Sequence, residues 1–138
     1  TTEIYTLSLH DALPIYSAGR EREIWDSFRD IIDICNQKKM DLLLIAGDIF
    51  HRQPLLRELK EMNSVLDMLE QTEVVMIAGN HDYIKKNSYY RTFSWSPHVH
   101  MIKDENLTCV ELGNIQTAGR IFQKLSAAYL QVSYPLHW

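Results

Sequence analysis

Two short apolar runs, each closed by a glycine and polar residues, constrain the fold of this chain most. Residues 41–46 (DLLLIA) are followed by Gly-Asp at 47–48, and residues 73–78 (EVVMIA) are followed by Gly-Asn-His-Asp at 79–82. Continuous apolar runs of this length are typical of strands that are buried on both faces, as in a parallel sheet. The glycines allow a sharp turn where each strand ends.

An amphipathic helix is predicted before each of these strands. Residues 20–39 and residues 54–70 both place apolar side chains at steps of three and four, and Pro54 suits the first turn of the second helix. The order helix, strand, helix, strand predicts an α/β fold with a right-handed βαβ unit. The apolar positions are Ile24, Phe28, Ile31, Ile32 and Cys35 in the first segment and Leu55, Leu59, Met62, Leu66 and Leu69 in the second.

The polar residues after the two strands are expected to meet at one edge of the sheet. Parallel strands end side by side, and ligands of open α/β sheets bind at that edge. Asp48 offers a carboxylate, Asn80 an amide oxygen, and His81 an imidazole that can coordinate a metal or donate a proton. Either motif alone would also fit an ordinary polar turn. Together they predict a two-metal site that acts on phosphoesters.

The remainder of the chain is less regular. Residues 99–102 and 107–112 are predicted to be short strands, and residues 5–9 give only a weak strand pattern. His98 and His100 alternate, and we expect them on a short exposed strand rather than at a metal.

Charge and composition leave the substrate open. The net charge of −4 gives no overall basic signature of a nucleic-acid binder, although bound metal ions can meet a phosphate. Basic and aromatic residues after the second strand could follow a DNA backbone and stack on bases, or could be a solvated loop with its aromatics packed on the domain. These residues are Lys85, Lys86, Tyr89, Tyr90, Arg91 and Trp95. Arg52 and Arg57 could likewise meet phosphates or be helix-surface charge.

The cysteines and the hydropathy favour a cytoplasmic protein without a membrane span. Cys35 and Cys109 are far apart and form no C-x-x-C arrangement, and Cys35 lies on the apolar face of the first helix. No apolar run approaches the ~18 residues of a membrane span, and the start of the chain lacks the pattern of a signal peptide.

The motifs resemble those of a known superfamily. Residues 42–50 (LLLIAGDIF) and 74–82 (VVMIAGNHD) are similar to the second and third motifs of the calcineurin-like metallophosphoesterases. The string GDIFH, which ends at His51, resembles the SbcD-type double-strand-break repair exonucleases within it. The resemblance covers about residues 19–112 and implies a partial metallophosphoesterase sandwich with βαβ units and the metal site at the carboxyl ends of its strands.

The resemblance also implies roles for individual residues. Asp48 would bridge two divalent metal ions, expected to be Mn²⁺, and Asn80 would bind one of them. His81 would contact the scissile phosphate and assist departure of the leaving oxygen, while His51 would position the DNA backbone. Asp82 is expected to orient His81 or cap the following segment rather than bind metal. The implied enzyme cleaves DNA, commonly with an SbcC-type ATPase partner; a phosphatase or phosphodiesterase of small phosphoesters is the alternative.

The sequence departs from the family pattern near both ends. It has no Asp-x-His on a first strand and lacks the later Gly-His and Gly-His-x-His motifs; residues 97–100 (PHVH) imitate the last of these but come too early. Residues 1–15 read as one translation frame of a sequencing-library adapter, which the genomic locus would test. We therefore expect residues 16–118 to be a partial metallophosphoesterase domain, residues 119–138 a frameshifted or disordered tail, and this chain an inactive fragment of its parent enzyme.

Overall fold

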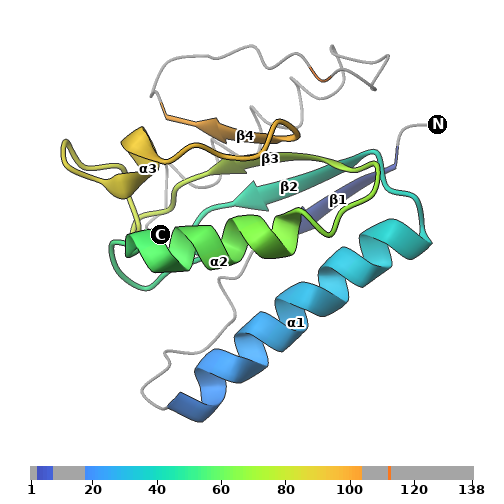
Figure 1. The fold of residues 1–138 in the computed structure, drawn as a ribbon, viewed down its shortest axis with the longest axis horizontal. Coiled ribbons are helices and arrows are strands. Elements are labelled where there is room, and N and C mark those ends of the chain that lie inside the picture. Colours follow the sequence, from blue (N-terminus) through green and yellow to red (C-terminus); the bar gives the residue numbers. More distant parts are fainter. Residues whose placement is uncertain (1–2, 8–17, 104–111, 113–138) are drawn as a thin grey trace, which may run out of the picture.

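The computed structural model describes residues 3–7, 18–103 and 112 of the 138-residue chain. In chain order the elements are strand β1 (Ile4–Leu7), helix α1 (Ala18–Gln37), strand β2 (Leu42–Ala46), helix α2 (Leu56–Leu66), strand β3 (Glu73–Ile77), the short helix α3 (Tyr89–Thr92) and strand β4 (Val99–Ile102). Figure 1 shows α1 and α2 on the same face of one sheet. Among these residues no helix is long and apolar enough to cross a membrane.

All four strands are parallel, and their order in the sheet is their order in the chain, β1-β2-β3-β4. The predicted strands at 41–46 and 73–78 are confirmed to within one residue at each end. The predicted strand at 99–102 is confirmed as β4. β1 overlaps the weak strand pattern predicted at residues 5–9, whereas most of the predicted strand at 107–112 lies outside the described residues.

Side chains of β2 and β3 alternate between two apolar layers. Leu43 and Ile45 of β2 and Met76 of β3 face the layer that contains α1 and α2, while Leu42, Leu44 and Val75 belong to a second cluster with Leu112. All of these residues are buried. The expectation that both strands are covered on two faces is therefore confirmed, as parallel strands require.

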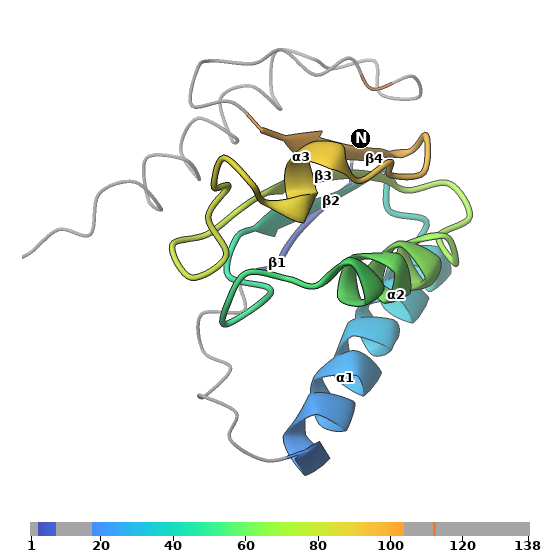
Figure 2. The same cartoon turned by 60° about the vertical axis from the view of Figure 1, so that its left-hand side comes forward.

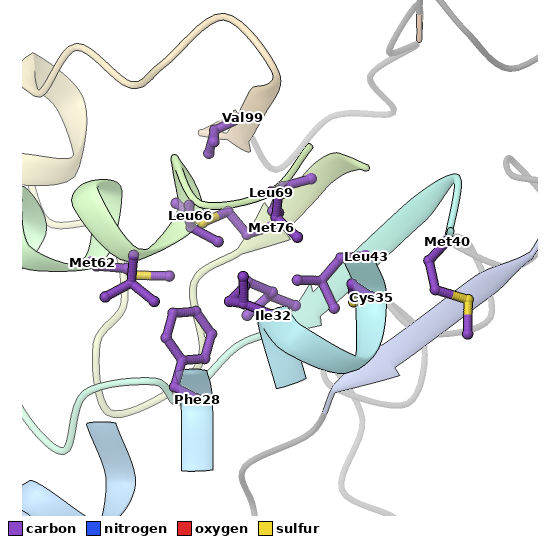
Figure 3. Close-up of a cluster of buried hydrophobic side chains, with 13 residues drawn as sticks. Phe28, Ile32, Cys35, Met40, Leu43, Met62, Leu66, Leu69, Met76 and Val99 are labelled. Atoms are coloured by element: carbon purple, nitrogen blue, oxygen red, sulfur yellow. The ribbon is translucent and has the colours of Figure 1, made fainter. Parts of the chain in front are cut away.

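The main core fills the space between the helices and the sheet (Figure 3). Phe28, Ile32 and Cys35 of α1 project into it, as the predicted apolar face requires. Met62 and Leu66 of α2 meet them there. Burial of this apolar surface holds α1 and α2 against the sheet and so fixes where β2 and β3 end.

Helix α1 ends in a Schellman motif. Met40 N–H donates to the Cys35 carbonyl at 2.9 Å, Lys39 N–H donates to the Asn36 carbonyl at 3.2 Å, and Lys39 has a φ of 51°. This left-handed residue satisfies the last carbonyls of the helix and turns the chain into β2. Lys38 and Lys39 therefore follow the last helical residue, where their positive charges lie close to the negative end of the helix dipole.

Helix α2 is shorter than the predicted segment 54–70. Pro54 precedes the helix instead of occupying its first turn, because Leu55 is the extended N-cap residue. At the other end Asn36 of α1 intervenes: its side chain donates to the Met68 carbonyl at 2.8 Å and accepts from Glu70 N–H at 3.0 Å. The Val65 and Leu66 carbonyls accept from Met68 and Leu69 N–H in short turns, so α2 ends at Leu66 and Asn36 bonds the residues that follow.

Candidate metal site at the strand ends

The turns that follow β2 and β3 touch each other through their backbones. Gly47 has a φ of 83°, and a side chain there would meet the Gly79 Cα at 2.7 Å and its N at 2.9 Å. A side chain at Gly79 would in turn overlap the backbone N and Oδ1 of Asp48. Both glycines are needed for this close approach, which brings the two polar motifs together as predicted from the sequence.

Asp48 adopts a left-handed conformation, with a φ of 54°. Asp is one of the few residues other than glycine that tolerate this region, since its short side chain can bond locally. Its Oδ1 accepts a hydrogen bond from the backbone N–H of His81 at 3.0 Å. The carboxylate is therefore held by the turn of the neighbouring strand.

The carboxamide of Asn80 lies against the carboxylate of Asp48. Its terminal atom is 2.9 Å from Asp48 Oδ1 and 2.7 Å from Asp48 Oδ2. With its nitrogen in this place, Asn80 donates two hydrogen bonds to the carboxylate. A half-turn of the carboxamide would instead bring the oxygens of both residues together, an arrangement that a bound cation would stabilise. Hard oxygen donors of this kind suit Mn²⁺ or Mg²⁺, so the pair fits a divalent ion.

His81 lies beside the same carboxylate. Its Nδ1 is 3.4 Å from Asp48 Oδ1, while the side chain remains 54% exposed. One ring nitrogen thus faces Asp48 and the other is directed away from it, as a group that exchanges a proton with a substrate would need.

His51 is also brought to this edge of the sheet. Its ring centroid is 6.1 Å from that of His81, with the ring planes at 70°, and the residue is exposed. All four residues selected from the sequence, Asp48, Asn80, His81 and His51, therefore gather at the carboxyl ends of β2 and β3. Their roles in binding and catalysis stay predictions.

Asp82 is the buried member of the second motif, with 0% of its surface exposed. Its carboxylate accepts hydrogen bonds from Gly79 N–H, Phe50 N–H and the Tyr90 hydroxyl. Burial raises its pKa, and the hydrogen bonds from Gly79, Tyr90 and Phe50 oppose that rise. The sequence suggested that Asp82 orients His81 or caps the following segment. Its hydrogen bonds instead join the two turns to α3.

The basic and aromatic residues around the site divide into two groups. Tyr83 is exposed, and Lys85 Nζ lies 5.2 Å from the centre of its ring. Tyr90 is buried and Trp95 packs against the main core, so neither is available to stack on a base. Arg52 forms two hydrogen bonds to Glu58 near the start of α2, at 2.8 and 3.0 Å. That contact favours the helix-surface interpretation of Arg52.

The two histidines near β4 have partners away from this site. His98 Nε2 lies 3.1 Å from the Leu66 carbonyl oxygen, and His100 Nε2 lies 2.8 Å from Glu73 Oε2. Both are half-buried, whereas the sequence led us to expect them on an exposed strand. Within the described residues, no group of three or more His, Cys, Asp or Glu side chains is arranged to hold a metal. Asp48 and Asn80 would therefore need further ligands to hold a metal ion.

Comparison with known protein families identifies the chain. The family model described as calcineurin-like phosphoesterase matches residues 9–130. The chain belongs to this family. A search of curated proteins found no match.

Membership of the calcineurin-like phosphoesterases confirms the superfamily inferred from the two strand-end motifs. It identifies the protein as a hydrolase-family member, in a family whose proteins typically bind divalent metals. The α/β architecture is also confirmed, since parallel strands alternate with helices. The described residues contain one sheet; the second sheet of the expected sandwich is not among them.

Proposed function

We propose that this calcineurin-like phosphoesterase derives from a DNA nuclease of the SbcD type that uses two divalent cations, with Mn²⁺ as the expected metal. The observation that carries the proposal is the approach of Asn80 to Asp48, within 2.7 and 2.9 Å of its two carboxylate oxygens. A carboxylate and a carboxamide this close together, at the carboxyl ends of adjacent parallel strands, can turn their oxygens to metal ions that stabilise the charge of a phosphoryl displacement.

Each residue then has a separate task. Asp48 would hold the cations through its carboxylate, and Asn80 would contribute a neutral oxygen that adds no charge. His81 directs one ring nitrogen away from Asp48, toward the place of the leaving oxygen, and donates the proton that this oxygen needs. The cations, when bound, supply positive charge at the phosphate.

The preference for DNA rests on His51 and on the exposed residues next to the motif. His51 completes the GDIFH string and lies 6.1 Å, ring to ring, from His81, where it would contact the phosphate backbone. Tyr83 and Lys85 follow the second motif and offer an exposed ring and a positive charge to a strand. We propose an SbcC-type ATPase as the partner of the intact enzyme.

A phosphatase or phosphodiesterase of small phosphoesters is the second candidate. The net charge of −4 favours it, since no broad basic surface is needed for a small substrate. It would use Asp48, Asn80 and His81 in the same way, but would not require His51.

Substrate choice tests the proposal. The protein expressed from its full gene is supplied with Mn²⁺ and given linear double-stranded DNA or bis-p-nitrophenyl phosphate. Degradation of DNA, lost on chelation with EDTA, is expected. Turnover confined to the small ester would select the second candidate.

Two variants refine this test. Asp48→Ala should abolish both Mn²⁺ binding and DNA cleavage. His51→Ala should weaken cleavage of DNA about tenfold or more while Mn²⁺ affinity stays unchanged. Equal activity of His51→Ala and the parent on DNA would remove the argument for the SbcD type.

A further inference from the structure

A buried carboxylate joins three segments around the candidate metal site. Asp82 Oδ1 accepts from Gly79 N–H at 2.6 Å, and Oδ2 accepts from the Tyr90 hydroxyl at 2.9 Å and from Phe50 N–H at 3.4 Å. Gly79 belongs to the turn after β3, Phe50 to the turn after β2, and Tyr90 to α3. Figure 2 shows α3 and the two connecting loops close together near the ends of the strands.

The hydroxyl of Tyr90 is the side-chain donor to this buried carboxylate. Tyr90 is 1% exposed, so a phenylalanine would fill nearly the same space. Burial and the negative charge of Asp82 raise the pKa of Tyr90 far above its ordinary value, so its hydroxyl remains a donor. A buried carboxylate without donors is costly, and the hydroxyl is one of three that Asp82 receives.

Helix α3 holds the hydroxyl in place. Its N-cap residue Ser88 is buried and accepts from Tyr90 N–H through its Oγ, while Arg91 Nε donates to the Lys85 carbonyl at 2.9 Å. A second contact joins the same two loops, since Gln53 Nε2 donates to the Tyr83 carbonyl at 2.7 Å. The loops are therefore fixed relative to each other and to α3.

The amides that Asp82 accepts from lie within two residues of the proposed ligands in the sequence. Gly79 precedes Asn80, and Phe50 lies two residues after Asp48. A shift of either amide would alter the 2.7 and 2.9 Å approach of Asn80 to the Asp48 carboxylate. It would also disturb the hydrogen bond from His81 N–H to Asp48 Oδ1.

We propose that Tyr90 is a positioning residue of the metal site, which acts through Asp82 to hold the turns carrying Asp48 and Asn80 in register. The inference rests on the proposed metal-binding role of Asp48 and Asn80. Tyr90 itself touches neither residue's carboxylate or amide in this arrangement; its contact is with Asp82.

The test compares Tyr90→Phe with Tyr89→Phe in the 138-residue chain. Tyr89 is adjacent, belongs to the same helix and is 47% exposed, so it controls for loss of a tyrosine hydroxyl. Amide hydrogen exchange is measured by NMR at Gly79, His81 and Phe50, with Val75 of β3 as the reference. Tyr90→Phe should accelerate exchange at the three turn amides about threefold or more relative to Val75.

In this comparison of exchange rates, two results would overturn the inference. One is unchanged exchange at Gly79, His81 and Phe50 in Tyr90→Phe. The other is an equal acceleration at Val75, which would indicate general destabilisation. Asp82→Asn provides a second variant: its amide can accept at only one oxygen, so exchange should rise at one of Gly79 and Phe50 more than at the other. Equal exchange at both amides would also count against the inference.

Binding of Mn²⁺, followed by its electron paramagnetic resonance signal, separates this inference from the proposed function. At a temperature well below the thermal midpoint of each variant, Tyr90→Phe should weaken binding about tenfold, Tyr89→Phe should leave it unchanged, and Asp48→Ala should abolish it. Full binding by Asp48→Ala would overturn the proposed metal site. Loss in Asp48→Ala together with full binding by Tyr90→Phe would overturn the positioning role alone.

Discussion

His81 and Asp48 are joined twice across the two strand-end turns. The backbone N–H of His81 donates to Asp48 Oδ1 at 3.0 Å, and its Nδ1 lies 3.4 Å from the same oxygen. A proposed proton donor is thus oriented by a proposed metal ligand. Substitutions can separate the two tasks, because one depends on the ring and the other on the carboxylate.

Replacement of the His81 ring should impair turnover more than metal binding. With DNA as the substrate, His81→Ala is expected to lower kcat by about 10²–10⁴-fold, since it removes the proposed general acid. The affinity for Mn²⁺ should change less than about threefold, because Asp48 and Asn80 remain. Single-turnover kinetics and metal titration measure the two effects. Parallel loss of affinity and turnover would instead make His81 a metal ligand.

A side chain at Gly79 should destabilise the fold. In Gly79→Ala the new methyl group would overlap the backbone N and Oδ1 of Asp48, so the two turns would have to separate. We expect the free energy of unfolding to fall by about 2–3 kcal/mol. Urea denaturation measures it, with the exposed Asn87→Ala as a control that should change stability by less than about 0.5 kcal/mol. A Gly79→Ala protein as stable as the control would show that the turns do not touch.

Glu58 should contribute to the start of α2 through its carboxylate. It accepts from the N-cap amide of Leu55 at 2.6 Å and pairs with Arg52 at 2.8 Å. Leu55 cannot return a side-chain hydrogen bond, so only half of a capping box is formed. Glu58→Ala should lower the free energy of unfolding by about 1 kcal/mol. Glu61→Ala, an exposed change on the same helix, is the control, and equal effects of the two would contradict this role.

Cys35 should be protected from reagents in the folded chain. It is fully buried, and burial raises its pKa above the ordinary value of 9.0. Alkylation by iodoacetamide at pH 8, mapped by peptide mass spectrometry, should be about tenfold or more slower than in denaturant. Rapid modification of Cys35 without unfolding would contradict its place in the core.

The raised pKa of Cys35 also predicts how the free energy of unfolding changes with pH. As pH rises above about 9, the unfolded chain loses the Cys35 proton first while the folded chain retains it, so stability should decrease. Cys35→Ala should be less stable at neutral pH but should lack this contribution. Denaturation of both proteins between pH 8 and 10 tests the difference, and parallel curves would contradict it.

The helices and strands could be predicted because their signals are local. The spacing of Phe28, Ile32 and Cys35 identifies one face of α1, and the continuous runs identify β2 and β3. The meeting of Asp48 and Asn80 then follows from two parallel strands. By contrast, the end of α2 depends on Asn36 of another helix, a contact that periodicity cannot show.

The contacts that hold the candidate metal site in place could not be predicted in the same way. Tyr89 and Tyr90 are identical neighbours in the sequence, yet one is exposed and the other is buried with its hydroxyl on Asp82. The orientation of α3 determines which of the two tyrosines is buried. A helix of four residues is too short to show a hydrophobic periodicity in the sequence. The left-handed conformation of Asp48 likewise lies at the contact between Gly47 and Gly79, which joins turns 32 residues apart and has no local sequence signal.

The agreement between strand order and chain order bears on how this protein is made. Among the four described strands, each pairs with the one synthesised just before it, so none of them has to be inserted between two that are already paired. The sheet can grow by one edge at a time as the chain leaves the ribosome. Each nascent edge remains exposed until the next crossover is made, and a pause in translation at that stage would favour pairing with another chain.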